Sequence, residues 1–215
     1  MIISESWLRE WVDSALTTEE LAATLTMAGL EVDGITPVAR EFSGIVVAEV
    51  RQVTQHPDAD KLRVCSVFDG EHEQQVVCGA PNVVSGMKAP FAMVGAKIKT
   101  EQSKQLKITK AKLRGVESHG MLCSAEELGL EESSDGLMEL PSDAPVGQDL
   151  RAYLQLSDSM IELDLTPNRG DCLGMRGIAR EVGVLSRKEV CEPDFNAVQP
   201  VHTEEFSIII SATEA

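Results

Sequence analysis

Apolar positions in the first 38 residues follow the spacing of two short helices and then of a strand. Residues 7–11 place apolar side chains on one helical face, and a Thr17-x-x-Glu20 capping box precedes a second helical stripe over residues 21–28. Gly29 is suited to end this second helix, because glycine readily adopts the left-handed backbone found after a helix C-terminus. Residues 31–38 are then predicted to form a strand.

The pattern changes from about Gly44, where short β-branched runs replace the helical stripes. Turn sequences such as Asp69-Gly70 and Ala80-Pro81-Asn82 separate these runs. The predicted strands cover residues 45–53, 62–68, 75–78, 90–94 and 104–113. Five short strands joined by tight turns favour a small closed β-barrel.

Mixed elements return beyond Gly147. A helix is predicted at 149–156, a strand at 160–165, a helix at 173–185 and a strand-like run at 207–210. The segments before and after the barrel are each too small to bury a core alone, so we expect one discontinuous α+β domain interrupted by the barrel.

The expected domain boundaries follow from these patterns. They are 1–38 and 149–192 for the two halves of the discontinuous domain, 39–148 for the barrel, and 193–215 for the start of a further, truncated domain. Because an apolar strand so close to the C-terminus would lack a partner, we expect the chain to be a piece of a longer protein.

Composition excludes several classes of protein. The 215 residues carry 19 Lys and Arg against 35 Asp and Glu, a net charge of −16, which excludes a uniformly basic nucleic-acid coat. The first residues include charges where a secretory signal needs an apolar run, and no stretch approaches 18 apolar residues. We therefore expect a cytoplasmic protein without membrane contact. The five cysteines are too widely spaced for a C-x-x-C metal site, and reduced thiols are expected.

One segment opposes the acidic trend. Residues 97–114 hold seven Lys and Arg and a single acid, Glu101. Strand alternation predicts that Leu106, Ile108 and Leu113 lie near the core while the lysines point outward, forming a strip of cations suited to phosphates. A solvated surface is the other interpretation of such a run. The candidate phosphate-binding residues are Lys61, Arg63, Lys97, Lys99, Lys104, Lys107, Lys110, Lys112 and Arg114.

Three turn motifs carry side chains that could do chemistry. The His56–Asp60 segment could bind a metal, but it lacks the glycine and distal glutamate of a calcium loop, which favours a turn with a structural His56. Cys78 could be a nucleophile, yet no base stands near it in sequence, which favours packing. Arg169 could bind a phosphate or form an ion pair within the chain, and the ion pair is favoured. No catalytic or metal-binding residue is assigned.

Five motifs in order resemble the tRNA-binding OB domain shared by several synthetase-associated proteins. They are His56-Pro57-x-Ala59-Asp60-Lys61-Leu62, Val77-Cys78-Gly79-Ala80-Pro81-Asn82, Gly95-Ala96, Ile108-x-x-Ala111-Lys112-Leu113-Arg114-Gly115-Val116 and Gly120-Met121-Leu122-Cys123-Ser124. This resemblance covers about residues 39–148 and implies a five-stranded OB-type barrel that binds tRNA.

The flanking motifs resemble the opening of the β subunit of bacterial phenylalanyl-tRNA synthetase. They are Ser6-Trp7-Leu8-Arg9-Glu10-Trp11, Met27-Ala28-Gly29-Leu30-Glu31-Val32-Asp33 and Thr166-Pro167-Asn168-Arg169-Gly170-Asp171-Cys172-Leu173-Gly174. The family implies an α2β2 ligase that joins phenylalanine to tRNA with ATP and magnesium, with the α subunit as partner. It places the editing pocket and the β-subunit magnesium ligands beyond residue 215, so the chain itself is expected to be non-catalytic and to hold no cofactor.

Two other functions remain compatible with these residues. The cationic strip could dock on an acidic surface of the same enzyme as an assembly module. The barrel could also belong to another synthetase-associated protein, although helical segments before it and further fold after it disfavour this. A tRNA gel shift at low salt separates RNA binding from docking.

Overall fold

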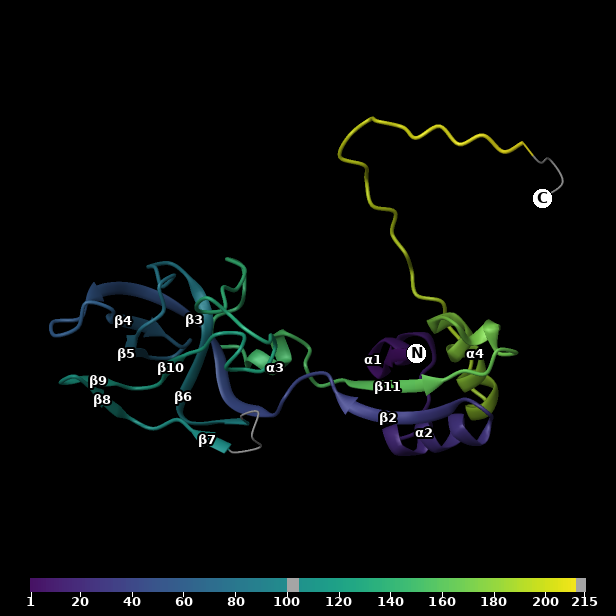
Figure 1. The fold of residues 1–215 in the computed structure, drawn as a ribbon, viewed down its shortest axis with the longest axis horizontal. Coiled ribbons are helices and arrows are strands. Elements are labelled where there is room, and N and C mark those ends of the chain that lie inside the picture. Colours follow the sequence, from purple (N-terminus) through teal and green to yellow (C-terminus); the bar gives the residue numbers. More distant parts are fainter. Residues whose placement is uncertain (100–104, 212–215) are drawn as a thin grey trace.

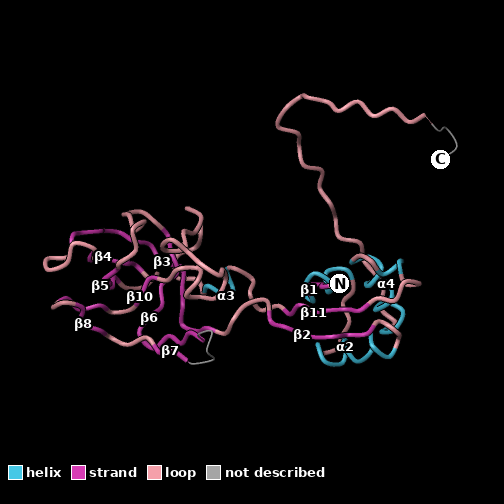
Figure 2. Tube along the Cα trace, in the orientation of Figure 1, coloured by secondary structure: helices cyan, strands magenta, loops and turns pink. Residues whose placement is uncertain are grey.

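The computed structural model describes residues 1–99 and 105–211. It is a mixed α+β structure. A helix-rich body that contains the N-terminus is joined by two connecting segments to a body of strands and loops (Figures 1 and 2). None of the helices in these residues has the length and apolar character needed to cross a membrane.

The helix-rich body is built from both ends of the chain. Its elements are β1 (Ile2–Ser4), α1 (Glu5–Trp11), α2 (Thr18–Met27), β2 (Glu31–Pro37), β11 (Ser159–Asp164), a 3-10 turn (Gly170–Cys172) and α4 (Met175–Ser186). The strands form an antiparallel sheet in the order β1-β11-β2, and Leu8, Leu25, Ile161 and Ile178 are buried together in its core. Residues from both ends of the sequence therefore share one apolar core.

The strand-rich body is organised around one curled antiparallel sheet. Its strands are β3 (Phe42–Gln55), β4 (Arg63–Phe68), β5 (Glu73–Cys78), β6 (Lys88–Lys99), β7 (Gln105–Lys107) and β10 (Met121–Leu122), with a separate hairpin of β8 (Ala111–Leu113) and β9 (Val116–Ser118), and a short helix α3 (Leu150–Tyr153). The order is β10-β6-β3-β4-β5, and β7 pairs with β6.

Bulges and edge contacts curl this sheet into a half-barrel. The register of β3 shifts between Ser43 and Ile45 and again between Val50 and Gln52, as expected where a strand bends. The β5 edge then approaches the β9–β10 segment, where the His119 N–H donates to the Gln75 carbonyl at 2.8 Å. Phe91 is fully buried inside the curl.

Most predicted elements are confirmed, and the exceptions have physical causes. The capping box of α2 forms as predicted between Thr17 and Glu20, and Gly29 follows the helix at a φ of +89°. The predicted strand over 104–113 is wrong as a single element, because the chain leaves the sheet between β7 and β8. The strand-like run at 207–210 is also not a strand; those residues are exposed and pair with no other strand in the described part of the chain.

Gly120 tests the packing inside the curl. It has a φ of +134°, and a Cβ placed there would lie 2.5 and 2.6 Å from Cε2 and Cζ of Phe91. Gly120→Ala is therefore expected to lower the free energy of unfolding by about 2 kcal/mol or more in urea denaturation, because the buried ring cannot move without disturbing the core. Gly86→Ala is the matched control, since Gly86 also has a positive φ, +89°, and nothing lies within 4 Å of its Cβ position. Equal stability of the two variants would contradict this packing.

Candidate nucleic-acid interface

Three lysines gather on the β6–β7 pair. Lys97 lies directly opposite Lys107 in the antiparallel register, and Lys99 lies opposite Gln105. Like charges directly opposite one another destabilise a sheet. Within residues 1–99 and 105–211, neither Lys97 nor Lys107 has an ion-pair partner, and Lys99 has an exposed one, Glu41, at 3.5 Å. Within the described residues, the pair therefore presents positive charge that is largely uncompensated.

The next three cations continue along the same edge of the body. Lys110 lies between β7 and β8, and Lys112 lies opposite Glu117 in the β8–β9 hairpin. Arg114 and Gly115 form the two-residue turn of that hairpin, and both have positive φ angles, 43° and 88°. Figure 1 shows β7 and β8 following one another along this edge. We call Lys97, Lys107, Lys110, Lys112 and Arg114 the cation edge.

His56 joins the cation edge to the loop that follows β3. The side chain is 2 % exposed; the backbone N–H of Asp58 donates to its Nδ1 at 3.1 Å, and its Nε2 lies 3.1 Å from the Leu113 carbonyl oxygen. Because Nδ1 accepts, the imidazole is neutral and carries its proton on Nε2, which donates to Leu113. This confirms a structural role for His56 and leaves neither ring nitrogen available to a metal.

The same contact brings the remaining candidates near the hairpin. Arg114 Nη1 donates to the Asp58 carbonyl at 3.4 Å, so the hairpin turn touches the loop that carries exposed Lys61. Arg63 is half-buried, and its Nη1 donates to the carbonyls of Asp60 and Leu62. The guanidinium of Arg63 is thus partly occupied within the protein.

Strand alternation misplaced part of this segment. Leu106 and Leu113 are 47 % and 41 % exposed, so the prediction that they lie near the core is wrong, whereas Ile108 is buried as predicted. The regular alternation ends here, because the pairing with β6 becomes irregular at Ile108: its N–H donates to the Ala96 carbonyl, while its carbonyl accepts from the Gly95 N–H. Lys104 lies outside the described residues.

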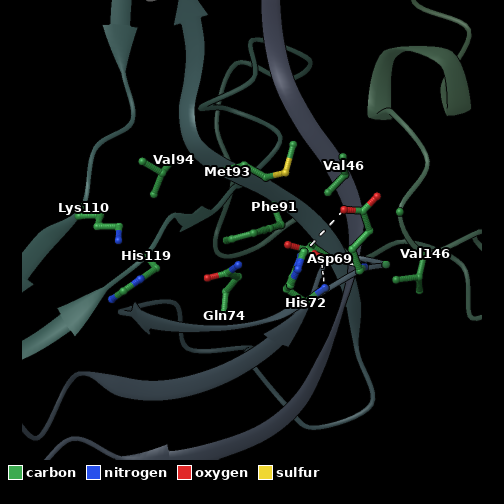
Figure 3. Close-up of a pocket in the computed structure, with 13 residues that line it drawn as sticks. Val46, Asp69, His72, Gln74, Phe91, Met93, Val94, Lys110, His119 and Val146 are labelled. Carbon is green, nitrogen blue, oxygen red and sulfur yellow. Dashed lines mark hydrogen bonds and ion pairs between the residues drawn. The ribbon is translucent and has the colours of Figure 1, made fainter.

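A groove of about 690 Å³, which no sequence pattern predicted, opens beside Lys110 (Figure 3). It lies between the β4–β5 turn, the middle of β6, and the segments that carry Lys110 and His119. Asp69 and His72 lie at one end and Lys110 and His119 at the other. Only the turn at Asp69-Gly70 was visible in the sequence, because the curl of the sheet is what brings these segments together.

The Asp69 carboxylate at the far end of the groove is held in its charged form. Burial, the largest single influence, raises its pKa, but the backbone N–H groups of His72 and Glu71 and the side chain of Gln74 together outweigh it, and the pKa is lowered overall. Asp69 and Glu71 therefore make one end of the groove negative, while Lys110 stands at the other end, where the His119 Nε2 lies 3.3 Å from the Glu117 carboxylate.

The other candidate side chains prove to be structural. Cys78 is buried in the core, as the packing interpretation predicts, and burial raises the pKa of its thiol. Arg169 pairs with Glu181 at 2.9 Å and with Asp171 at 3.3 Å, which confirms the internal ion pair. Asp171, Cys172 and Glu181 lie close enough together to resemble a metal site, but the Arg169 guanidinium already forms ion pairs with both carboxylates.

The tautomer of His56 is a direct test of the loop–hairpin contact. Nitrogen NMR of the imidazoles is expected to show His56 protonated on Nε2 alone. His56→Ala should lower the free energy of unfolding by about 1–3 kcal/mol, because the Asp58 N–H and the Leu113 carbonyl lose their partner. His72→Ala, on an exposed side chain, is the control and should change little. A His56 proton on Nδ1 would contradict the contact.

Known proteins match this chain both over residues 45–149 and along its whole length. A family model described as "Putative tRNA binding domain" matches residues 45–149. The phenylalanine–tRNA ligase beta subunit of Pseudomonas fluorescens is 59 % identical over 95 % of this chain and 25 % of that protein. Those of Hahella chejuensis and Shewanella oneidensis are 58 % and 55 % identical over the whole chain and 27 % of each protein.

The chain thus spans about a quarter of the length of the curated relatives it matches. The similarity extends through both the helix-rich and the strand-rich body, because the whole chain is aligned. The chain is thus homologous along its whole length to part of the phenylalanine–tRNA ligase beta subunits, and it carries a tRNA-binding domain over residues 45–149.

Proposed function

We propose that this chain supplies an accessory tRNA-binding surface to a phenylalanine–tRNA ligase. In this proposal the ligase joins phenylalanine to tRNA in the cytoplasm with ATP and magnesium, and pairs this beta subunit with an alpha subunit in an α2β2 assembly. The chain itself contributes binding and no chemical step. Its similarity along its whole length to beta subunits of this ligase supports the assignment.

We also propose that residues 39–148 form a five-stranded OB-type barrel inserted between the two halves, 1–38 and 149–192, of a discontinuous domain. The strand order β10-β6-β3-β4-β5 and the hydrogen bond between His119 and Gln75 support a barrel that closes at this edge. The position of β11 between β1 and β2 supports the discontinuous domain. Residues 193–215 would begin the next domain.

The observation that carries the proposal is the uncompensated charge of the cation edge. Lys97, Lys107 and Lys110 are exposed, and in the described residues they have no carboxylate within ion-pair distance. Flexible ammonium groups spaced along one edge suit the phosphates of an RNA backbone. Further phosphate contacts are proposed at the two ends of the row formed by Lys97, Lys107 and Lys110. They come from Lys61, Arg63, Lys99, Lys104, Lys112 and Arg114.

Aromatic stacking can contribute little to this binding. Phe42 and Phe91 are buried, and Phe68 lies beneath the Arg51 guanidinium, 3.9 Å from its ring centroid. Proteins that bind single strands by stacking need exposed rings. Phosphate contacts therefore dominate, and binding is expected to be salt-sensitive and tolerant of sequence.

Charge reversal on the cation edge tests the function. Binding of unmodified tRNA should weaken with salt at a log–log slope of about −3 to −4 if roughly four phosphates are neutralised. The triple variant Lys107→Glu, Lys110→Glu, Lys112→Glu should abolish the gel shift at low salt. The matched control carries the same charge change on α4 and just after it, as Arg176→Glu, Arg180→Glu and Lys188→Glu, and should retain most of the binding.

The outcome also separates the two candidate roles. Equal loss in both triple variants would show that net charge alone matters and would remove the assignment of the cation edge. Folded wild-type chain that gives no shift with tRNA would contradict RNA binding and favour docking on an acidic protein surface.

A further inference from the structure

The groove beside Lys110 is continuous with the cation edge but differs from it in chemistry. Lys110 belongs to both, because it follows the β7 lysine in the chain and also lines the groove. Away from Lys110 the lining is mixed: Met93, Val94 and Val146 supply apolar wall, and polar side chains lie between and beyond them (Figure 3). An RNA backbone lying on the cation edge would therefore pass the open end of a recess that is partly apolar.

The polar groups of the groove are ordered along its length. Lys110 and His119 stand together at the end nearest the cation edge, and Gln74 lies between them and Asp69 (Figure 3). Glu71 lines the far end beside Asp69. A ligand that is anionic at one end and offers N–H or O–H donors at the other matches this order, whereas a ligand with negative charge at both ends does not.

The size of the groove limits what can fill it. Its volume of about 690 Å³ falls within the range of roughly 300–1,000 Å³ typical of small-molecule sites. A paired RNA helix is far too wide, so only an unpaired residue of an RNA chain could enter. Unpaired loop and end nucleotides are also the parts of RNA whose bases are free to be splayed out.

We propose that the groove receives one unpaired nucleotide of the bound tRNA. Its phosphate lies against Lys110, and its base packs on Met93 and Val94. The Gln74 amide faces the edge of the base, and the carboxylates beyond it accept base N–H groups or the ribose hydroxyl. This proposal rests on the proposed tRNA-binding function and adds to it a base-contacting subsite.

The charge arrangement fixes the direction in which the nucleotide enters. Asp69 remains ionised, because two backbone N–H groups donate to one of its oxygens. A phosphate at that end would meet the charges of Asp69 and Glu71 and be repelled. The base end is therefore directed inward, and the phosphate stays beside the lysine.

Filling the groove without changing its charge tests the proposal. Val94 is 45 % exposed, so Val94→Trp can be accommodated while its ring occupies the recess. Affinity for tRNA is expected to fall about tenfold, the order set by one base contact, with an unchanged salt slope because no phosphate contact is lost. Val84→Trp, on a 55 % exposed valine that does not line the groove, is the matched control and should bind as wild type.

Two further measurements separate base contact from phosphate contact. Lys110→Ala should make the salt slope shallower by about one phosphate, 0.7–0.9. Chemical probing of the tRNA should show one unpaired base protected by wild type and exposed again with Val94→Trp. Gln74→Ala, which opens the groove instead of filling it, repeats the test with a smaller change and should also weaken binding without altering the slope.

Each result decides the proposal. A Val94→Trp variant that is folded by circular dichroism and binds tRNA as wild type overturns the subsite while leaving the cation edge intact. A drop in affinity with a shallower slope, or no protected base, assigns the groove to the backbone and also overturns it. Absence of tRNA binding by wild type overturns both the subsite and the proposed function.

Discussion

The pairing of β11 with both β1 and β2 is the constraint on which the arrangement of this chain depends. Because residues 159–164 must lie between residues 2–4 and 31–37, the chain between them has to leave this sheet and return to the same place. The Val38 N–H, which donates to the Asp158 carbonyl at 3.0 Å, marks the point of return. Arg151 reinforces it by donating to the carbonyls of Arg40 and Leu156. The strand-rich body is thus held at both ends, and β8 and β9 lie at its far end from β11 (Figure 1).

The distance of the β8–β9 hairpin from the helix-rich body explains how an acidic protein can bind an anionic partner despite their like net charges. Residues 40–148 hold 12 basic and 16 acidic side chains, so the flanks carry −12 of the total −16. Screening at physiological salt weakens interactions beyond about 8 Å, and Lys112 and Arg114, which belong to the β8–β9 hairpin at the far end of the strand-rich body, are therefore shielded from most of the acidic flanks. Lys97 and Lys107 repel one another in the free protein. A bound polyanion screens that repulsion, and this favours its binding at the β6–β7 pair.

Local patterns carried enough information to predict the helices and most of the strands. The Thr17 capping box and the glycine at position 29 are interactions within a few residues, and they appear where predicted. The cation edge was also predictable in outline, because seven Lys and Arg residues follow one another within residues 97–114 of the sequence. The irregular pairing at Ile108 was not, since it depends on backbone bonds to Gly95 and Ala96 on another strand. The groove and the partner of His56 likewise arise from contacts between segments far apart in the sequence.

Hydrogen exchange of the backbone amides, with and without tRNA, tests the central claim most directly because it reports where RNA lies on the protein. The account predicts slower exchange on tRNA binding in the β7–β9 region, residues 105–118, and around the groove, with no change in α4. Protection confined to α4 and the flanks, or a bound complex with no change in residues 105–118, would contradict it.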